Sequence, residues 1–126
     1  MDPIELPLPA NTIRKNIEKL IPDVTDVDRD EHGNKKYGGH ALSELITQMK
    51  VALEINENWE GRLRYWSIIT RLVNPQKKAY LIPLLREIQL NPGEPTESVL
   101  RSGWFIEVND EPRLGAGATA LFIVPC

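Results

Sequence analysis

The sequence has a single cysteine, no excess of positive charge and no long apolar run. Because Cys126 is the only cysteine among 126 residues, no disulfide can form within the chain, and we expect a reducing, cytoplasmic location. A net charge of -3 excludes a protein that coats nucleic acid through bulk positive charge, although it is compatible with a local basic patch. No apolar run approaches the roughly 20 residues that cross a bilayer, so we expect a soluble protein that binds no membrane.

The first ten residues, MDPIELPLPA, also lack the basic start and the apolar centre of a secretory signal peptide. Three prolines alternate there with Ile4, Leu6 and Leu8. Proline at such spacing is typical of extended backbone. The pattern predicts an extended arm over residues 1–10, which lies over its own core or over a neighbouring molecule.

Between residues 11 and 102, apolar side chains recur mainly with helical spacing. We expect helices over about residues 11–21, 40–57, 58–73 and 74–90. Trp66 lies at the centre of the broadest apolar stripe, which predicts that it is fully buried between two helices. Pro83 lies inside the last segment, so either that helix kinks there or residues 79–82 are extended and the helix restarts. We favour the kink.

The polar segment over residues 23–39 has no period long enough to require a helix or a strand. A small hairpin is one interpretation, with residues 25–29 and 35–37 as its strands, and a loop is the interpretation that we favour. Residues 104–108 (WFIEV) and 113–124 are rich in strand formers and enclose a turn. The predicted fold is therefore α+β: one domain over residues 1–126, with four helices packed in sequence followed by a C-terminal β-hairpin over residues 103–126.

The aspartates of the polar segment alternate like the first ligands of a calcium loop. The template then fails, because its turn position holds Glu31 instead of glycine and its closing position holds Tyr37 instead of glutamate. The two histidines have no zinc-site spacing. We therefore predict no catalytic residue, no metal and no cofactor. A small enzyme or metal-dependent sensor that uses Asp28, Asp30 and His32 is the third functional hypothesis.

The first functional hypothesis comes from the C-terminal strand, whose residues form an uncharged run without alternation. Both faces of such a strand need cover, and a lone hairpin leaves its outer edge open to another chain. We therefore predict a non-catalytic interaction or assembly module, either a homodimer or bound to a protein partner. In the alternative arrangement, this strand is central in a small sheet within the chain. The predicted interface comprises Leu121, Phe122, Ile123, Val124, Ile4, Leu6 and Leu8.

The second functional hypothesis is a nucleic-acid-binding accessory protein. If the helices predicted over residues 58–73 and 74–90 pack antiparallel, four basic side chains share one face. These are Arg64, Arg71, Lys77 and Lys78. The alternative is that these charges only keep an apolar helix pair in solution.

Overall fold

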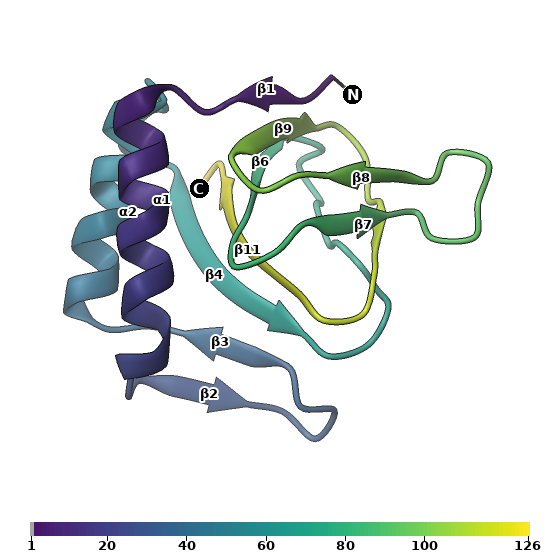
Figure 1. Cartoon of the computed structure of the whole chain (residues 1–126), viewed down its shortest axis with the longest axis horizontal. Helices are drawn as coiled ribbons and strands as arrows, with labels where there is room; N and C mark the ends of the chain where they lie inside the picture. The colour runs from purple at the N-terminus through teal and green to yellow at the C-terminus, as the bar shows by residue number, and fades with distance from the viewer. Residues whose placement is uncertain (1) are drawn as a thin grey trace.

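The protein is described by a computed structural model over residues 2–126, with two helices and eleven strands in that range (Figure 1). The helices are α1 (Leu8–Leu20), followed by a short 3₁₀ turn (Ile21–Asp23), and α2 (His40–Ala52). The strands are β1 (Ile4–Glu5), β2 (Val27–Arg29), β3 (Lys35–Tyr37), β4 (Glu60–Trp66), β5 (Thr70–Arg71), β6 (Ala79–Pro83), β7 (Ile88–Leu90), β8 (Ser98–Leu100), β9 (Trp104–Val108), β10 (Arg113–Leu114) and β11 (Ala118–Val124).

The strands form two antiparallel sheets. The large sheet has seven strands in the order β1-β9-β6-β11-β4-β3-β2, and the small sheet has four in the order β5-β10-β7-β8. The two helices lie side by side over one face of the large sheet (Figure 1). Apolar residues of the small sheet pack on the opposite face, so the large sheet is the middle layer of the molecule.

Strand β11 shows how the two halves of the core divide. Leu121 and Ile123 belong to the cluster on the helix side, whereas Ala120 and Phe122 belong to the cluster on the side of the small sheet. This alternation follows from the pleat, which turns successive side chains to opposite faces. The expectation that both faces of this run need cover is confirmed.

The predicted fold of four helices followed by a hairpin is wrong. The segments over residues 58–73 and 74–90 contain strands β4 to β7, and the two helices predicted there do not exist. In β4 the side chains alternate, with Leu63 buried and Arg62 and Arg64 on the other face. A short amphipathic run fits a helical and a strand period about equally well, and in β4 the aromatic residues Tyr65 and Trp66 favour the strand.

Both helices exist, with different ends from those expected. Helix α1 begins at Leu8 rather than after Asn11, because Pro9 in its first turn needs no hydrogen-bond partner for its nitrogen. Helix α2 begins at His40 as predicted and ends at Ala52 instead of residue 57. Glu54 has a φ of 56°, and this left-handed residue turns the chain away from the helix axis.

The structure also decides between the alternatives that the sequence allows at three further segments. Residues 23–39 contain the hairpin β2–β3, so the loop interpretation is wrong. Residues Ala79–Pro83 are strand β6, so no kinked helix exists there. The strands predicted over residues 104–108 and 113–124 exist as β9 and as β10 with β11, yet they form no hairpin, because β6 lies between β9 and β11.

The last strand is central in the large sheet. Strand β11 pairs with β4 from Ala118 to Val124 and with β6 from Ala120 to Ile123. The outer edge of β11, which was predicted to be open to another chain, is therefore paired within the chain. The free edges of the large sheet are those of β1 and β2.

Candidate functional site

A cavity of about 470 Å³ lies at the end of the large sheet that the small sheet leaves uncovered. Within the large sheet, strands β6, β9 and β11 supply buried side chains to the core on that side, and β2 and β3 supply none. Strands β2 and β3 extend away from the small sheet at the bottom of Figure 1. Residues of β2, β3, β4 and β5 line the cavity, together with Phe122 of β11.

The cavity is strongly basic. Six of the fifteen lysines and arginines of the chain line it, against two carboxylates, Asp28 and Asp30. The protein as a whole carries a net charge of -3, so this concentration of positive charge is local. We call the site the basic cleft, and its six cations are Arg29, Lys35, Lys36, Arg62, Arg64 and Arg71.

Strand register explains why three of these cations lie together. It also places Arg29 and Lys35, which pair with each other, on the opposite face of the sheet with Tyr65. Arg62, Arg64 and Trp66 are alternate residues of β4 and share one face. Lys36 pairs directly opposite Arg64, and Phe122 pairs opposite Arg62 on the other neighbouring strand. The guanidinium of Arg62 lies 5.8 Å from the ring centre of Phe122, within the range of a cation–π contact.

The charge of the basic cleft is largely uncompensated. Arg62 forms an ion pair with Glu60 at 3.1 Å, and this hydrogen bond holds the pKa of Glu60 below its ordinary value. Within residues 2–126, no ion pair is recorded for the other five cations. Burial, and then the charge of Arg62, lower the pKa of Arg64, against an opposing effect of Glu60. An anion placed between these side chains would relieve that repulsion.

Aromatic rings form the floor of the basic cleft. The ring centres of Trp66 and Phe122 are 6.0 Å apart, with planes inclined by 36°. Phe122 is only 6 % exposed, whereas Trp66 is half-buried and lines the cavity. The prediction that Trp66 is fully buried between two helices is therefore wrong, because it lies on a strand at the border between core and cleft.

Hydrogen bonds hold the two rims of the basic cleft together. The Asn34 Oδ1 atom accepts a bond from the backbone N–H of Ser67 at 2.8 Å, and the Ser67 hydroxyl donates to the His32 carbonyl oxygen. These bonds join the turn of the β2–β3 hairpin to the turn between β4 and β5. We call this group, Asn34 and Ser67, the strap. It fixes the hairpin that carries Arg29, Lys35 and Lys36 relative to β4.

Two of the four basic residues expected to share one face line the same cavity. Arg64 and Arg71 both line the basic cleft, on β4 and β5 instead of on helices. Lys77 lies in the turn after Asn74, and Lys78 lies 5.2 Å over the ring of Trp59, which packs against the helix-side core. The prediction of basic helix faces is therefore wrong, although Arg64 and Arg71 both line the basic cleft.

Sequence reasoning missed Arg29, Lys35, Lys36 and Arg62 as members of one site. One signal was present, the alternation Arg62–Arg64–Trp66, which places two cations and an aromatic ring on one face of a strand. The three side chains share one face only if the segment is a strand, so the row is not apparent when the segment is assumed to be a helix. The contribution of β2 and β3 depends on strand pairing, which has no local signal in the sequence.

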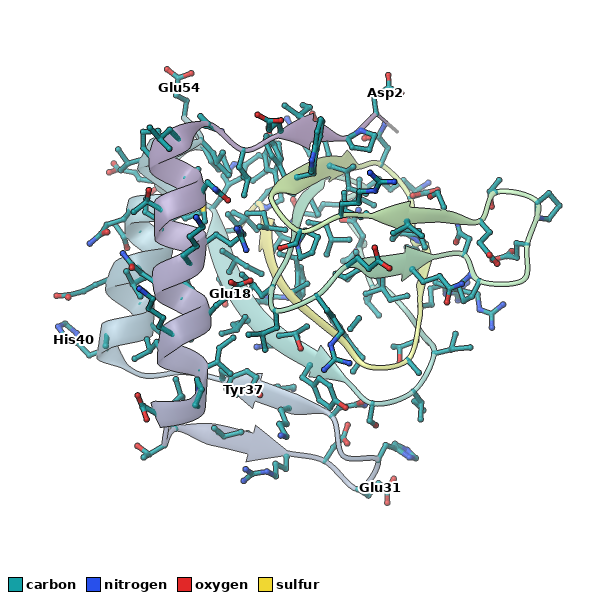
Figure 2. The ribbon with its side chains drawn as sticks, viewed as in Figure 1. Asp2, Glu18, Glu31, Tyr37, His40 and Glu54 are labelled. Carbon is teal, nitrogen blue, oxygen red and sulfur yellow. The ribbon has the colours of Figure 1, made fainter. Side chains whose placement is uncertain are left out.

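The acidic and histidine residues of the third hypothesis do not converge on a common centre. Asp28 and Asp30 lie at the margin of the basic cleft, while His32 is exposed and lies 3.6 Å from the Glu31 carboxylate. Figure 2 shows Glu31 at the tip of the β2–β3 hairpin and His40 at the outer end of α2. Among residues 2–126, no group of three or more His, Cys, Asp or Glu side chains is placed to hold a metal ion.

The predicted interface residues fall into two groups. Leu121, Phe122 and Ile123 are buried in the core, Leu6 of the arm is also buried, and Val124 is half-buried. Ile4 and Leu8 are exposed, at 51 % and 79 % of their surfaces. Strand β1 pairs with β9, so the arm lies along its own sheet and its outer edge is free.

Comparison of the sequence with known families finds no family model that matches, and comparison with curated proteins finds no match. In the part of the chain that the structure describes, no helix has both the length and the apolar character needed to cross a membrane.

Proposed function

We propose that the protein binds single-stranded nucleic acid in the basic cleft. The observation that carries this proposal is that six cations line one cavity, with Lys36, Arg62 and Arg64 on the same sheet face, in a chain whose net charge is negative. A charge concentrated in this way attracts an anionic ligand to one place, whereas the rest of the surface does not attract it.

The chemistry of the cleft favours nucleic acid over a simple anion. Lysine and arginine contacts to phosphates supply most of the affinity in such complexes, and aromatic side chains add stacking to exposed bases. The basic cleft has both kinds of group, with Arg62 and Arg64 beside Trp66. Its volume of about 470 Å³ is suited to a molecule of the size of a nucleotide and not to a duplex.

Fluorescence anisotropy with a labelled oligothymidylate tests the proposal. Binding should weaken as the salt concentration rises, because each neutralised phosphate of a single strand contributes about -0.7 to the slope of log K against log salt. Replacing Lys36 or Arg71 by glutamine should weaken binding and make that slope shallower by about 0.7, since each removes one cation of the cleft.

Lys77→Gln is the matched control, because Lys77 is an exposed cation outside the basic cleft. This variant should bind with unchanged affinity and salt slope. Equal losses for Lys36→Gln, Arg71→Gln and Lys77→Gln would mean that binding is diffuse and not located in the cleft. Absence of binding at low salt would contradict the proposed function altogether.

Self-association is a second candidate function, favoured by the exposed arm. We propose that two copies meet along the free edge of β1, where Ile4 exposes apolar surface, together with the exposed Leu8 at the start of α1. A two-fold axis would allow the same edge to serve both copies. This places the contact on the arm and not on Leu121–Val124, whose strand has both edges paired.

Light scattering at about 100 μM tests self-association, because even a micromolar dimer would be populated at that concentration. Ile4→Lys and Leu8→Lys should convert the dimer to a monomer, while Val51→Lys, at an exposed apolar position of α2, should not. A monomeric unmodified protein would exclude a homodimer of this affinity.

A further inference from the structure

We infer that the basic cleft recognises bases as well as phosphates, with Trp66 as the stacking platform for one nucleobase and Arg62 and Arg64 as holders of the adjoining phosphates. This inference rests on the proposed function and names the residue that would distinguish a nucleic acid from other polyanions.

The order of side chains along β4 carries the inference. Arg62, Arg64 and Trp66 project from the same face, and alternate residues of a strand are about 7 Å apart. Two cations and then an aromatic ring thus follow one another in a row along the floor of the cavity. An extended nucleic-acid strand presents phosphates in a comparable row, with its bases free to turn toward a ring.

Trp66 is the aromatic residue placed for stacking. Phe122 is only 6 % exposed, and the Arg62 guanidinium lies 5.8 Å over its ring. The ring of Tyr65 is approached by the Lys35 ammonium at 5.3 Å. Trp66 is half-buried, lines the cavity and packs against Phe122, whose ring centre lies 6.0 Å away. A ring packed in this way can accept a base without moving.

The same geometry discriminates against other ligands. In a duplex, the bases are stacked inside the helix and cannot reach the floor of a cavity, so a single strand is required. A polyglutamate chain supplies negative charge but no flat group for Trp66. We therefore expect a preference for a strand with bases over an acidic peptide of similar charge.

The experiment compares three probes: a labelled oligothymidylate, an abasic oligonucleotide of the same length, and polyglutamate. The abasic strand keeps the phosphates and lacks the bases. The oligothymidylate should bind between about 5-fold and 150-fold more tightly than the abasic strand, which corresponds to the stacking of one base. Trp66→Leu should abolish that difference, and Trp104→Leu, which alters a tryptophan on β9 outside the cleft, should leave it intact.

A second measurement does not require a change at Trp66. In a variant with Trp59→Phe and Trp104→Phe, the fluorescence of Trp66 should be quenched by the oligothymidylate and not by the abasic strand. Equal affinity for both strands, or an absent quench, would show that only phosphates are bound, and the inference would be wrong while the proposed function stood. Polyglutamate binding as tight as oligothymidylate would overturn the inference in favour of an acidic protein partner. Failure of every probe to bind would reject the proposed function as well.

Discussion

At the scale of single residues, Gly61 marks a close approach between helix α2 and the large sheet. A Cβ atom at this position would overlap the Ile46 side chain of α2 and would lie 3.6 Å from Leu121. Ile46 is itself buried in the helix-side core. The absence of a side chain at residue 61 therefore sets how near α2 packs to β4.

Gly61→Ala should destabilise the protein by about 1–3 kcal/mol, the usual cost of overfilling a packed core. Ile46→Ala should cost about 2–5 kcal/mol through the cavity that it leaves. The double variant should lose less than the two losses together, because the shortened residue 46 makes room for the new methyl group. Urea denaturation measures all three free energies, and additive losses would show that the two residues do not compete for the same space.

Asp30 shows how one carboxylate shapes the hairpin turn. Its oxygens accept bonds from the N–H groups of His32 and Asn34 at 2.9 and 3.0 Å, and from Asn34 Nδ2 at 2.9 Å. Desolvation tends to raise the pKa of Asp30, but the hydrogen bonds of Asn34 and His32 outweigh it and bring the pKa below its ordinary value. The ionised form is therefore favoured by folding.

A carboxyl with a lowered pKa stabilises the folded state above its pKa in the unfolded chain, and this stabilisation is lost as the pH falls through the folded pKa. Asp30→Asn should consequently be less stable than the unmodified protein at pH 7. The difference should shrink in acid, below the ordinary range of aspartate. Denaturation at a series of pH values measures it, with Asp23→Asn as a control at an exposed aspartate away from the hairpin. A difference that is constant with pH would contradict this account.

At the scale of elements, the β2–β3 hairpin depends on the strap for its position. It is a short edge hairpin, paired with the rest of the large sheet only through β3 and β4. Three-residue strands are marginal alone, so bonds outside the ladder matter for their order. Asn34 provides such bonds, since it receives the Ser67 N–H and donates to Asp30.

Asn34→Ala should increase amide hydrogen exchange in residues 30–37 and at Ser67, with little change in the helices. Because the hairpin carries Lys36, which lies opposite Arg64 in the cleft, we also expect weaker binding of oligothymidylate. Asn16→Ala is the control, at an exposed asparagine of α1. Unchanged exchange in the hairpin would show that strand pairing alone fixes it.

The elements that were predicted correctly are those with a strong local signal. Helix α2 has a long apolar stripe, and β9 and β11 are dense in strand formers. Strand β4 was misassigned because its apolar residues also fit a helical period. Arg64 and Arg71 were singled out because charge is visible in the sequence, whereas the approach of Lys36 to Arg64 depends on a register between β3 and β4. Pairing partners are chosen by the whole fold, and no single segment encodes them.

At the scale of the whole molecule, the sheets are built largely from distant partners. Glu60 pairs with Val124 and Ile4 pairs with Phe105, so the two ends of each pair are separated by half the chain or more. Domains dominated by such contacts fold slowly, because the cost of closing long loops precedes the gain from pairing.

Refolding from denaturant should therefore take milliseconds to seconds, well outside the microsecond range of helical bundles. Stopped-flow tryptophan fluorescence measures this rate over a range of urea concentrations. Leu121→Ala, at the centre of β11, should lower the free energy of unfolding by about 2–5 kcal/mol. The folding rate of this variant would show whether β11 has paired in the transition state. Refolding in microseconds would contradict the dominance of distant contacts.

The central place of β11 has a consequence for the nascent chain. The ribosome releases β4 and β6 long before β11, because about fifty residues separate the end of β4 from the start of β11. At 5–20 residues per second, that interval lasts roughly 3–10 s. Throughout it, the inner edge of β4 has no partner, and during about the last 35 residues the inner edge of β6 has none either. The apolar residues around these strands have no finished core. Unpaired strand edges of this kind are the surfaces through which chains aggregate and which chaperones shield. Yield during synthesis should thus depend on chaperone supply more than the stability of the finished domain would indicate.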